Sequence, residues 1–268
     1  MNYFENKVVV VTGGSEGIGK ALVEALLRKG AKVATCSRNF DKLYNLQTQC
    51  AGKPLFIKTT DVSRESECQS FIEETIQTYG HIDILINNAG ISMRAMFADT
   101  DTETLHRLMD VNFWGAVYCT KAALDSILKQ KGDIVGVSSI AGFRGLPGRS
   151  GYSASKFALN GWLEALRTEL FNTGVNVMWV CPGYTTSNIR NAALNAHAEP
   201  QGESPLEEDK LMSAEECAGH ILKSVERRQR TLVLTTTGKE TVLINKLIPR
   251  LADKLVYKFF FKNGVLTK

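Results

Sequence analysis

The stretch KVVVVTGGSEGIG, residues 7–19, decides the fold. Its four consecutive valines form a short β-branched run, which is typical of a buried parallel strand, and glycines follow directly. Beyond Gly17, apolar residues recur at helical spacing, and Gly30 ends the segment. We therefore predict a strand, a tight glycine turn and a helix over residues 17–30.

The glycine turn has the spacing of a dinucleotide-binding loop. Gly13 permits the tight turn, Gly17 lets the backbone approach a pyrophosphate, and Gly19 lets helix and strand pack closely. The N-terminus of the helix offers N–H donors and the positive end of its dipole to phosphates. A glycine-rich turn without a ligand is the alternative, but the strand–loop–helix context favours cofactor binding. Ser15 and Ile18 belong to the same predicted cofactor-binding loop.

The rest of the chain alternates strands and helices. Further strands are predicted at 31–37, 55–62, 82–90, 132–139, 175–183 and 230–236, and helices at 64–79, 101–130, 151–172 and 213–228, with one more helical stretch between the second and third strands. Such alternation predicts an α/β fold, a doubly wound parallel sheet with helices on both faces. We expect one Rossmann domain over residues 1–235 and an appendage over 236–268.

The end of the second strand bears on the choice of dinucleotide. NAD sites commonly carry an acidic residue there, which binds the ribose hydroxyls. This chain has Ser37 and Arg38 instead, and both side chains suit a 2′-phosphate. The alternative is that Arg38 is only a solvated charge on a loop. Glu16, inside the glycine loop, would lie close to a 2′-phosphate, which is unfavourable for NADP(H). The sequence favours NADP(H) over NAD(H).

The stretch YSASK, residues 152–156, places a phenol and an ammonium on one helical face. Tyr152 and Lys156 are four residues apart, so their tips lie close together. A phenol with a pKa of roughly 10 exchanges its proton poorly at neutral pH. A neighbouring ammonium lowers that pKa, which makes the phenol a usable acid. An ordinary surface pair is the alternative interpretation.

Five motifs occur in order: TGGSEGIG at 12–19, NNAG at 87–90, SS at 138–139, YSASK, and PG at 182–183. Together they closely resemble the short-chain dehydrogenase/reductase family, over residues 7 to about 235. The resemblance implies a seven-stranded Rossmann sheet and a catalytic set of Ser139, Tyr152 and Lys156, completed by Asn112. A weaker likeness is to the branch that reduces lipid-like ketones, which includes 3-ketosphinganine reductases.

The resemblance also implies contacts to the cofactor. Asp61 and Val62 match the pair that contacts adenine, and Asn88, Ala89 and Gly90 match the loop beside the cofactor ribose.

The segment beside the nicotinamide begins at Pro182 and Gly183. The family usually has an aliphatic residue and then a threonine after this pair. This chain offers Thr185 and Ser187, and Ser187 retains a hydroxyl. We expect both residues to contact the cofactor.

The expected reaction is reduction of a ketone to a secondary alcohol, or its reverse. Tyr152 would donate the proton, and Lys156 would also hold the nicotinamide ribose. Ser139 would hydrogen-bond the substrate oxygen, and Asn112 would hold a water that links Lys156 to solvent.

Residues 184–212 are expected to form a mobile lid over the substrate. A predominantly apolar pocket is predicted from Met93, Met96, Phe97, Phe143, Leu146 and Tyr184. The favoured substrate is a 3-oxo long-chain lipid, and the alternative is a 3-oxoacyl-carrier-protein. The alternative outside enzymes is a catalytically silent dinucleotide-binding sensor.

The C-terminal extension is basic and amphipathic. Between Gly238 and Lys268 it has seven basic and two acidic residues, a net charge of +5. Apolar residues at steps of four, the leucines from Leu243 to Leu255 and then Phe259, run beside a basic stripe. Pro249 should kink this helix or start a second one. The sequence leaves two locations open for this helix. It lies on a membrane surface, or it docks on this subunit or on a partner.

Composition excludes several classes of protein. The net charge of +4 and the absence of a dense basic tract before the C-terminus argue against nucleic-acid binding. Six scattered cysteines and four scattered histidines predict no disulfide framework and no metal site. We expect a cytoplasmic protein without a signal peptide, with a membrane contact only through the extension. By family resemblance, the helices at 101–130 and 151–172 would form a homodimer or homotetramer interface.

Overall fold

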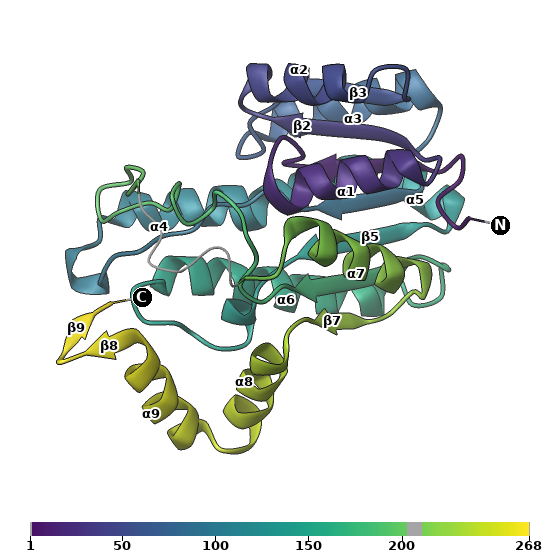
Figure 1. Ribbon diagram of the computed structural model, residues 1–268. Coiled ribbons are helices and arrows are strands. Elements are labelled where there is room, and N and C mark those ends of the chain that lie inside the picture. Colours follow the sequence, from purple (N-terminus) through teal and green to yellow (C-terminus); the bar gives the residue numbers. More distant parts are fainter. Residues whose placement is uncertain (1, 203–210, 268) are drawn as a thin grey trace.

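The computed structural model describes residues 2–202 and 211–267 (Figure 1). Over these residues, seven parallel strands form one sheet in the order β3-β2-β1-β4-β5-β6-β7. The strands are β1 (Val8–Thr12), β2 (Lys32–Ser37), β3 (Leu55–Thr59), β4 (Ile84–Asn87), β5 (Asp133–Val137), β6 (Asn176–Cys181) and β7 (Thr231–Val233). The predicted seven-stranded parallel sheet is confirmed. Because the strand order reverses between β1 and β4, a crevice is expected at their carboxyl ends.

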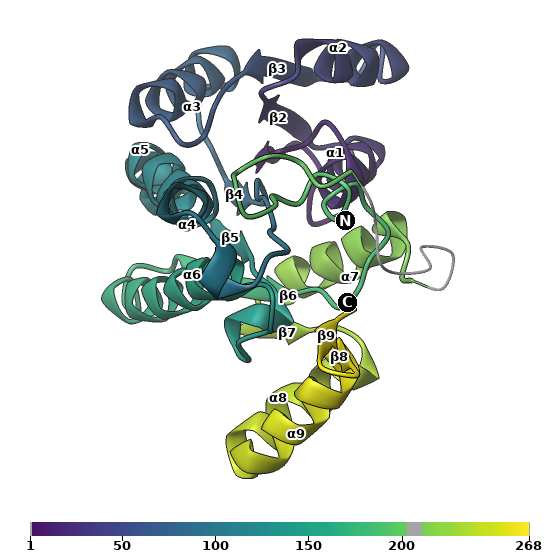
Figure 2. The same ribbon diagram turned by 90° about the vertical axis from the view of Figure 1, so that its left-hand side faces the viewer.

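Helices cover both faces of the sheet (Figure 2). One face carries α1 (Gly17–Arg28), α2 (Phe40–Gln49) and α7 (Ala214–Glu226). The other carries α3 (Glu65–Tyr79), α5 (Gly115–Gln130) and α6 (Ser150–Glu169), with α4 (Thr102–Met109) leading into α5. The doubly wound architecture is therefore confirmed.

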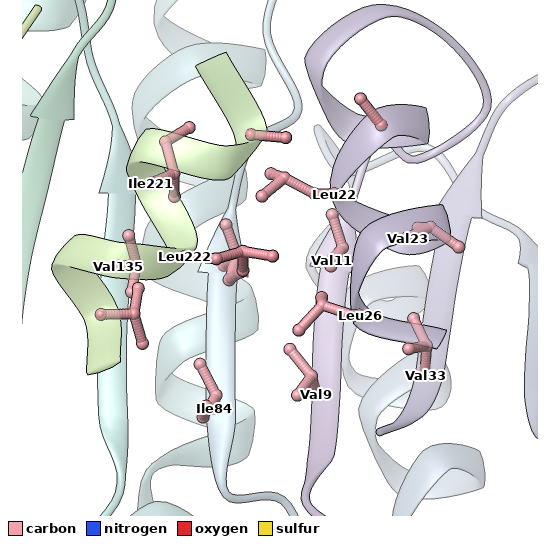
Figure 3. Close-up of a cluster of buried hydrophobic side chains, with 14 of the residues drawn as sticks. Val9, Val11, Leu22, Val23, Leu26, Val33, Ile84, Val135, Ile221 and Leu222 are labelled. Atoms are coloured by element: carbon pink, nitrogen blue, oxygen red, sulfur yellow. The ribbon is translucent and has the colours of Figure 1, made fainter. Parts of the chain in front are cut away.

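The alternation of β1 divides its valines between two cores. Val9 and Val11 join the cluster under α1 and α7, whereas Val8 and Val10 join the cluster under the helices of the opposite face. Figure 3 shows Val11 beside Leu22 of α1. Each fully buried side chain of this size contributes roughly 1.5–3 kcal/mol of transfer free energy. The two cores hold β1 rigidly, and β1 in turn fixes the start of the glycine loop.

Two predicted elements differ in detail. The helix predicted over 101–130 is interrupted by a π-helical turn, Asp110–Trp114, whose wider turn re-aims one side chain; such turns often occur at functional sites. The strand predicted over 230–236 ends at Val233, because Thr235 caps the next helix by accepting a hydrogen bond from the Gly238 N–H.

The C-terminal extension forms two helices and a small hairpin. They are α8 (Thr236–Leu247), α9 (Pro249–Phe260), β8 (Phe261–Lys262) and β9 (Val265–Leu266). Pro249 starts the second helix, at a position where its missing N–H is harmless. Figure 1 shows α8 and α9 leaving the sheet beyond β7 as a helical arm.

This arm contacts the body of its own chain. Arg144 forms an ion pair with Asp253 (2.6 Å), and the Asn245 amide donates to the Phe143 carbonyl (2.9 Å). The rings of Tyr184 and Phe259 stack with centroids 6.4 Å apart. Among the described residues, no helix is both long and apolar enough to cross a membrane.

Candidate active site

The glycine loop joins β1 to α1 in a conformation that favours glycine. Gly13 and Gly17 have φ angles of 70° and 55°, and a Cβ at Gly13 would lie 2.8 Å from Ala89 Cα. Glu16 stands at the N-cap of α1 without capping it through its side chain. The first N–H groups of α1 are therefore left for an anion, as a pyrophosphate requires.

The loop opens into one cavity of about 770 Å³ that extends to the C-terminal arm. Every predicted cofactor and catalytic residue except Asn112 lines this cavity: Gly13, Ser15, Gly17, Ile18, Gly19, Ser37, Arg38, Asp61, Val62, Asn88, Ala89, Gly90, Ser139, Tyr152, Lys156, Pro182, Gly183, Thr185 and Ser187. The chain thus brings residues from seven segments to one place, at the carboxyl edge of the sheet.

The end of the cavity near β2 is basic. Ser37 and Arg38 both line it, together with Lys42 of α2. Lys42 forms an ion pair of 2.6 Å with Glu16, which offsets the acid that the glycine loop carries. The sequence analysis did not predict Lys42 as a cofactor-binding residue, although its position four residues after Arg38 suggested that the two side chains lie close together.

Asn88 ties the end of β4 to the glycine loop. Its amide donates to the backbone carbonyls of Thr12 (2.9 Å) and Gly13 (3.1 Å). In return, the Thr12 hydroxyl accepts from the backbone N–H groups of Asn88 and Ala89, at 3.0 Å each. These four hydrogen bonds fix the floor of the cavity beside the loop.

Tyr152 is buried in the first turn of α6. Burial raises the pKa of its phenol, and a hydrogen bond with Ser139 and the charge of Arg149 act in the opposite direction. Ser139 accepts a hydrogen bond from the Ala141 N–H (3.1 Å), so its own hydrogen remains available for donation. A phenol and a donating hydroxyl therefore face the same space.

Lys156 lies one turn further along α6, with only 4% of its surface exposed. Its ammonium donates to the Val137 carbonyl and lies 5.8 Å from the centroid of the Tyr152 ring. Burial lowers its pKa to about 8. In this arrangement the lysine bonds to β5, and the charges that lower the Tyr152 pKa are those of Arg149 and then Arg190.

Asn112 lies behind the cavity wall, in the π-helical turn. Its side chain exchanges two hydrogen bonds with the backbone of Ile91 (2.8 and 2.9 Å) and donates a third to Ser155 (2.9 Å). A Cβ on Gly90 would lie 3.1 Å from the Asn112 oxygen and 3.5 Å from the Lys156 nitrogen. Asn112 thus links the loop after β4 to α6, next to Lys156.

The described part of the predicted lid, 184–202 with 211–212, contacts the loop after β4. The backbones of Ser92 and Arg94 exchange hydrogen bonds with Leu194 (2.8 and 2.9 Å). Residues 203–210 lie outside the described residues. Movement of this segment stays a prediction.

The apolar wall differs from the prediction. Leu146 and Tyr184 line the cavity, but Met93 is packed in a separate core cluster, and Met96 and Phe97 are exposed. Phe143 packs against the core beneath α6. None of these four side chains lines the cavity, although Ser92 and Leu146 on the same loops do.

The missing wall is supplied by the arm. Its apolar contributions are Ile244, Ala252, Leu255, Val256, Phe259 and Phe260. Leu255 and Phe259 end the predicted apolar stripe, but the sequence did not show that this end would reach the cavity.

The residues present fit a dinucleotide. The uncapped N-terminus of α1 suits the pyrophosphate, the basic edge at Arg38 suits the adenosine end, and Tyr152 and Lys156 lie toward the other end. Among the described residues, no cluster of histidine, cysteine or acidic side chains could hold a metal ion.

Comparisons with known proteins agree with this arrangement. The model of the short chain dehydrogenase family matches residues 7–198. Dehydrogenase/reductase SDR family member 7B of Mus musculus is 34% identical over 95% of this chain and 81% of its own length. The 11-beta-hydroxysteroid dehydrogenase A of Arachis hypogaea is 35% identical over 92% of this chain and 73% of its own.

Solved structures show the same fold. An alcohol dehydrogenase from the archaeon Thermococcus sibiricus, complexed with 5-hydroxy-NADP, has a TM-score of 0.76 and 26% identity, and the match covers 86% of this chain and 96% of that chain. A short chain dehydrogenase/reductase from Burkholderia phymatum, in complex with NAD, has a TM-score of 0.82 at 22% identity, over 94% and 96% of the two chains. With the family model matching more than half of its residues, the chain belongs to the short-chain dehydrogenase family of oxidoreductases.

Proposed function

We propose that this protein is an NADP(H)-dependent carbonyl reductase that converts the ketone of an apolar, lipid-like 3-oxo substrate to a secondary alcohol, or catalyses the reverse. The observation that carries the proposal is the shared cavity. The glycine loop, Tyr152 and an apolar wall from the C-terminal arm all line it.

The bound dinucleotide supplies or accepts the hydride. Tyr152 donates a proton to the oxygen of the substrate carbonyl as negative charge develops there, and takes it back in the reverse direction. Ser139 donates a hydrogen bond to the same oxygen, because its hydroxyl hydrogen is left available by the bond it accepts from Ala141. Burial of the phenol keeps it protonated until the substrate needs the proton.

Lys156 holds the nicotinamide ribose and supports Tyr152. Its ammonium has three donor hydrogens, and the Val137 carbonyl takes one of them. The remaining hydrogens are available to ribose hydroxyls. Asn112 links the loop at Ile91 to α6 through hydrogen bonds, so that the lysine stays beside the cavity.

The test is a comparison of wild type with Tyr152→Phe on a panel of 3-oxo lipids, 3-oxoacyl thioesters, steroids and sugars. We expect kcat/KM to fall by at least about a hundredfold on every substrate that wild type reduces, because proton transfer is lost. Binding of NADPH, measured by fluorescence, should persist in the variant. Equal turnover by the two proteins would refute the mechanism.

Two other functions are distinguished by the same panel. A 3-oxoacyl-carrier-protein reductase would favour thioesters over free lipids. A catalytically silent dinucleotide sensor would bind NADPH and reduce nothing. The buried Tyr152, the hydroxyl of Ser139 and the buried Lys156 favour an enzyme, since a binding protein needs none of these three together.

The arm also offers a surface for a membrane. Four large apolar side chains at the turn between α8 and α9 are exposed: Leu243, Leu247, Ile248 and Leu251. The same two helices carry four basic side chains: Lys239, Lys246, Arg250 and Lys254. These positive charges complement the anionic headgroups of lipids around the apolar tip. We propose that the tip touches an anionic membrane surface from which an apolar substrate reaches the cavity.

Co-sedimentation with liposomes tests this contact. We expect binding to vesicles that contain phosphatidylserine, weaker binding to neutral vesicles, and loss of binding in Leu247→Glu/Leu251→Glu. A control, Phe171→Glu, alters an exposed apolar side chain that follows α6, outside the arm. Equal sedimentation of wild type and the double variant would contradict the membrane contact.

A further inference from the structure

The cavity contains a buried cation that the proposed reaction does not use. Arg149 stands at the N-cap of α6, three residues before Tyr152, and 9% of its surface is exposed. It lines the cavity, and its buried Nε has no hydrogen-bond partner. Among the residues that the structure describes, no carboxylate forms an ion pair with it. The guanidinium of Arg149 is therefore available to form an ion pair with an anion that enters the cavity.

The surroundings of Arg149 explain why an anion is needed. Burial lowers the pKa of its guanidinium, and the charges of Arg190 and Arg94 act in the same direction, whereas Tyr184 and Tyr152 oppose them. Two arginines and two tyrosines thus lie close enough to affect the charge of Arg149. A buried charge without a counterion is expensive in free energy, typically several kcal/mol.

The acids that line the cavity are placed elsewhere. Glu16 is paired with Lys42 at the adenosine end, and Asp61 accepts hydrogen bonds from the N–H and hydroxyl of Ser63. Glu240 is on the exposed surface of α8. Within the described part of the chain, the cavity wall thus has a cationic end near Tyr152.

We propose that Arg149 binds a carboxylate of the substrate, so that the substrate is an amphipathic oxo acid. The inference rests on the proposed function and names its substrate class. The carboxylate would pair with the planar guanidinium, the ketone would face Tyr152, and the hydrocarbon chain would lie along Leu255 and Phe259.

The first experiment measures kcat/KM of the NADPH-loaded enzyme for a ten-carbon 3-oxo acid and for its methyl ester. Wild type should prefer the acid by about tenfold or more, and Arg149→Met should reduce that ratio by about ten- to a hundredfold, the range for a charge-assisted hydrogen bond. Arg149→Lys should keep part of the preference, because the charge remains and the fork is lost. Arg28→Met, which alters an exposed arginine in the last turn of α1 and outside the cavity, should keep the wild-type ratio.

The second experiment needs no turnover. Decanoate and decanol are titrated by calorimetry into the enzyme with NADP⁺ present. Decanoate should bind more tightly to wild type, and Arg149→Met should lose this difference, with circular dichroism showing that the variant is folded. If decanoate binding requires Arg149 while no ketone is reduced, the anion site stands and the reductase proposal fails. If acid and ester are reduced equally by wild type, or if Arg149→Met binds decanoate as wild type does, the carboxylate site is overturned.

Discussion

The ammonium of Lys156 donates a 2.9 Å hydrogen bond to the backbone carbonyl of Val137, the last residue of β5. The bond joins the catalytic helix to the carboxyl edge of the sheet, at residues 19 positions apart in the sequence. The ammonium is buried, and this burial lowers the Lys156 pKa from 10.5 to about 8. The cost of burying this charge has a measurable dependence on pH.

The free energy of unfolding should rise with pH between about pH 8 and 10.5. In this window the unfolded lysine still binds a proton that the folded lysine has released, so the unfolded state binds more protons. Below about pH 8 both states are charged and the penalty is fully present. Urea unfolding at pH 7 and at pH 10 should show Lys156→Met losing up to about 3 kcal/mol of this gain relative to wild type. An exposed lysine on α5, in Lys129→Met, serves as the control; identical pH dependence in wild type and Lys156→Met would contradict the prediction.

Ser139→Ala should reduce kcat/KM by about a hundred- to a thousandfold, the typical loss for one donor to a developing oxyanion. The substitution also removes a hydrogen bond that lowers the Tyr152 pKa. The pKa of the group that governs the pH–rate profile should therefore rise. Its neighbour Ser138 gives a matched control, Ser138→Ala, for which we expect a smaller loss; equal losses in the two variants would argue against a specific role for Ser139.

Arg38→Ala should raise the KM for NADPH by about ten- to a hundredfold and leave the KM for NADH much less affected. The reason is the 2′-phosphate, which only the first of these cofactors has. Lys42→Met should act in the same direction, because it also leaves Glu16 without its ion pair beside the phosphate. Steady-state kinetics with both cofactors checks this, and equal increases for NADPH and NADH would exclude recognition of the phosphate by Arg38.

Phe259→Ala should weaken binding of long substrates more than that of short ones. The ring lines the cavity and stacks on Tyr184, so its loss shortens the apolar wall. KM measured for 3-oxo substrates of four and of twelve carbons should rise for the longer one by about tenfold and change little for the shorter one. Tyr257→Ala removes an exposed aromatic ring of α9 that does not line the cavity, and should leave both KM values nearly unchanged. A uniform rise would place the substrate chain elsewhere.

Trp114→Glu/Phe157→Glu should convert an oligomer to a monomer. Both rings are exposed on the face that α5 and α6 present, at 43% and 46%, and large exposed aromatics are enriched at interfaces. Light scattering coupled to size-exclusion chromatography gives the mass of wild type and of the variant. Wild type that elutes as a monomer of 29.5 kDa would contradict the expected homodimer or homotetramer.

The sheet and the cofactor end of the cavity could be predicted because their signals are local. A run of valines followed by Gly13 and Gly17 specifies strand, turn and helix within twenty residues. The parallel sheet then brings Asn88 and Tyr152 to the same edge, since all carboxyl ends meet there. For these residues a motif and its place in the strand–helix order were sufficient.

The substrate end could not be predicted in the same way. Its wall depends on the direction in which α9 returns after Pro249, which is set by tertiary contacts such as Arg144 with Asp253. The position of Arg149 in the cavity wall, without a carboxylate partner among the described residues, could not be predicted from the sequence either, because it depends on tertiary packing. The π-helical turn that aims Asn112 has no residue pattern that distinguishes it from the helix around it.

The arm that lines the substrate end follows the glycine loop and the rest of the cavity wall in the chain. Residues 12–156 carry the glycine loop and the catalytic set, and more than a hundred further residues follow before Lys268. On the ribosome, the strands that cradle a nucleotide emerge well before α9 does. The part of the cavity that would select the substrate is therefore completed after the part that would bind the nucleotide.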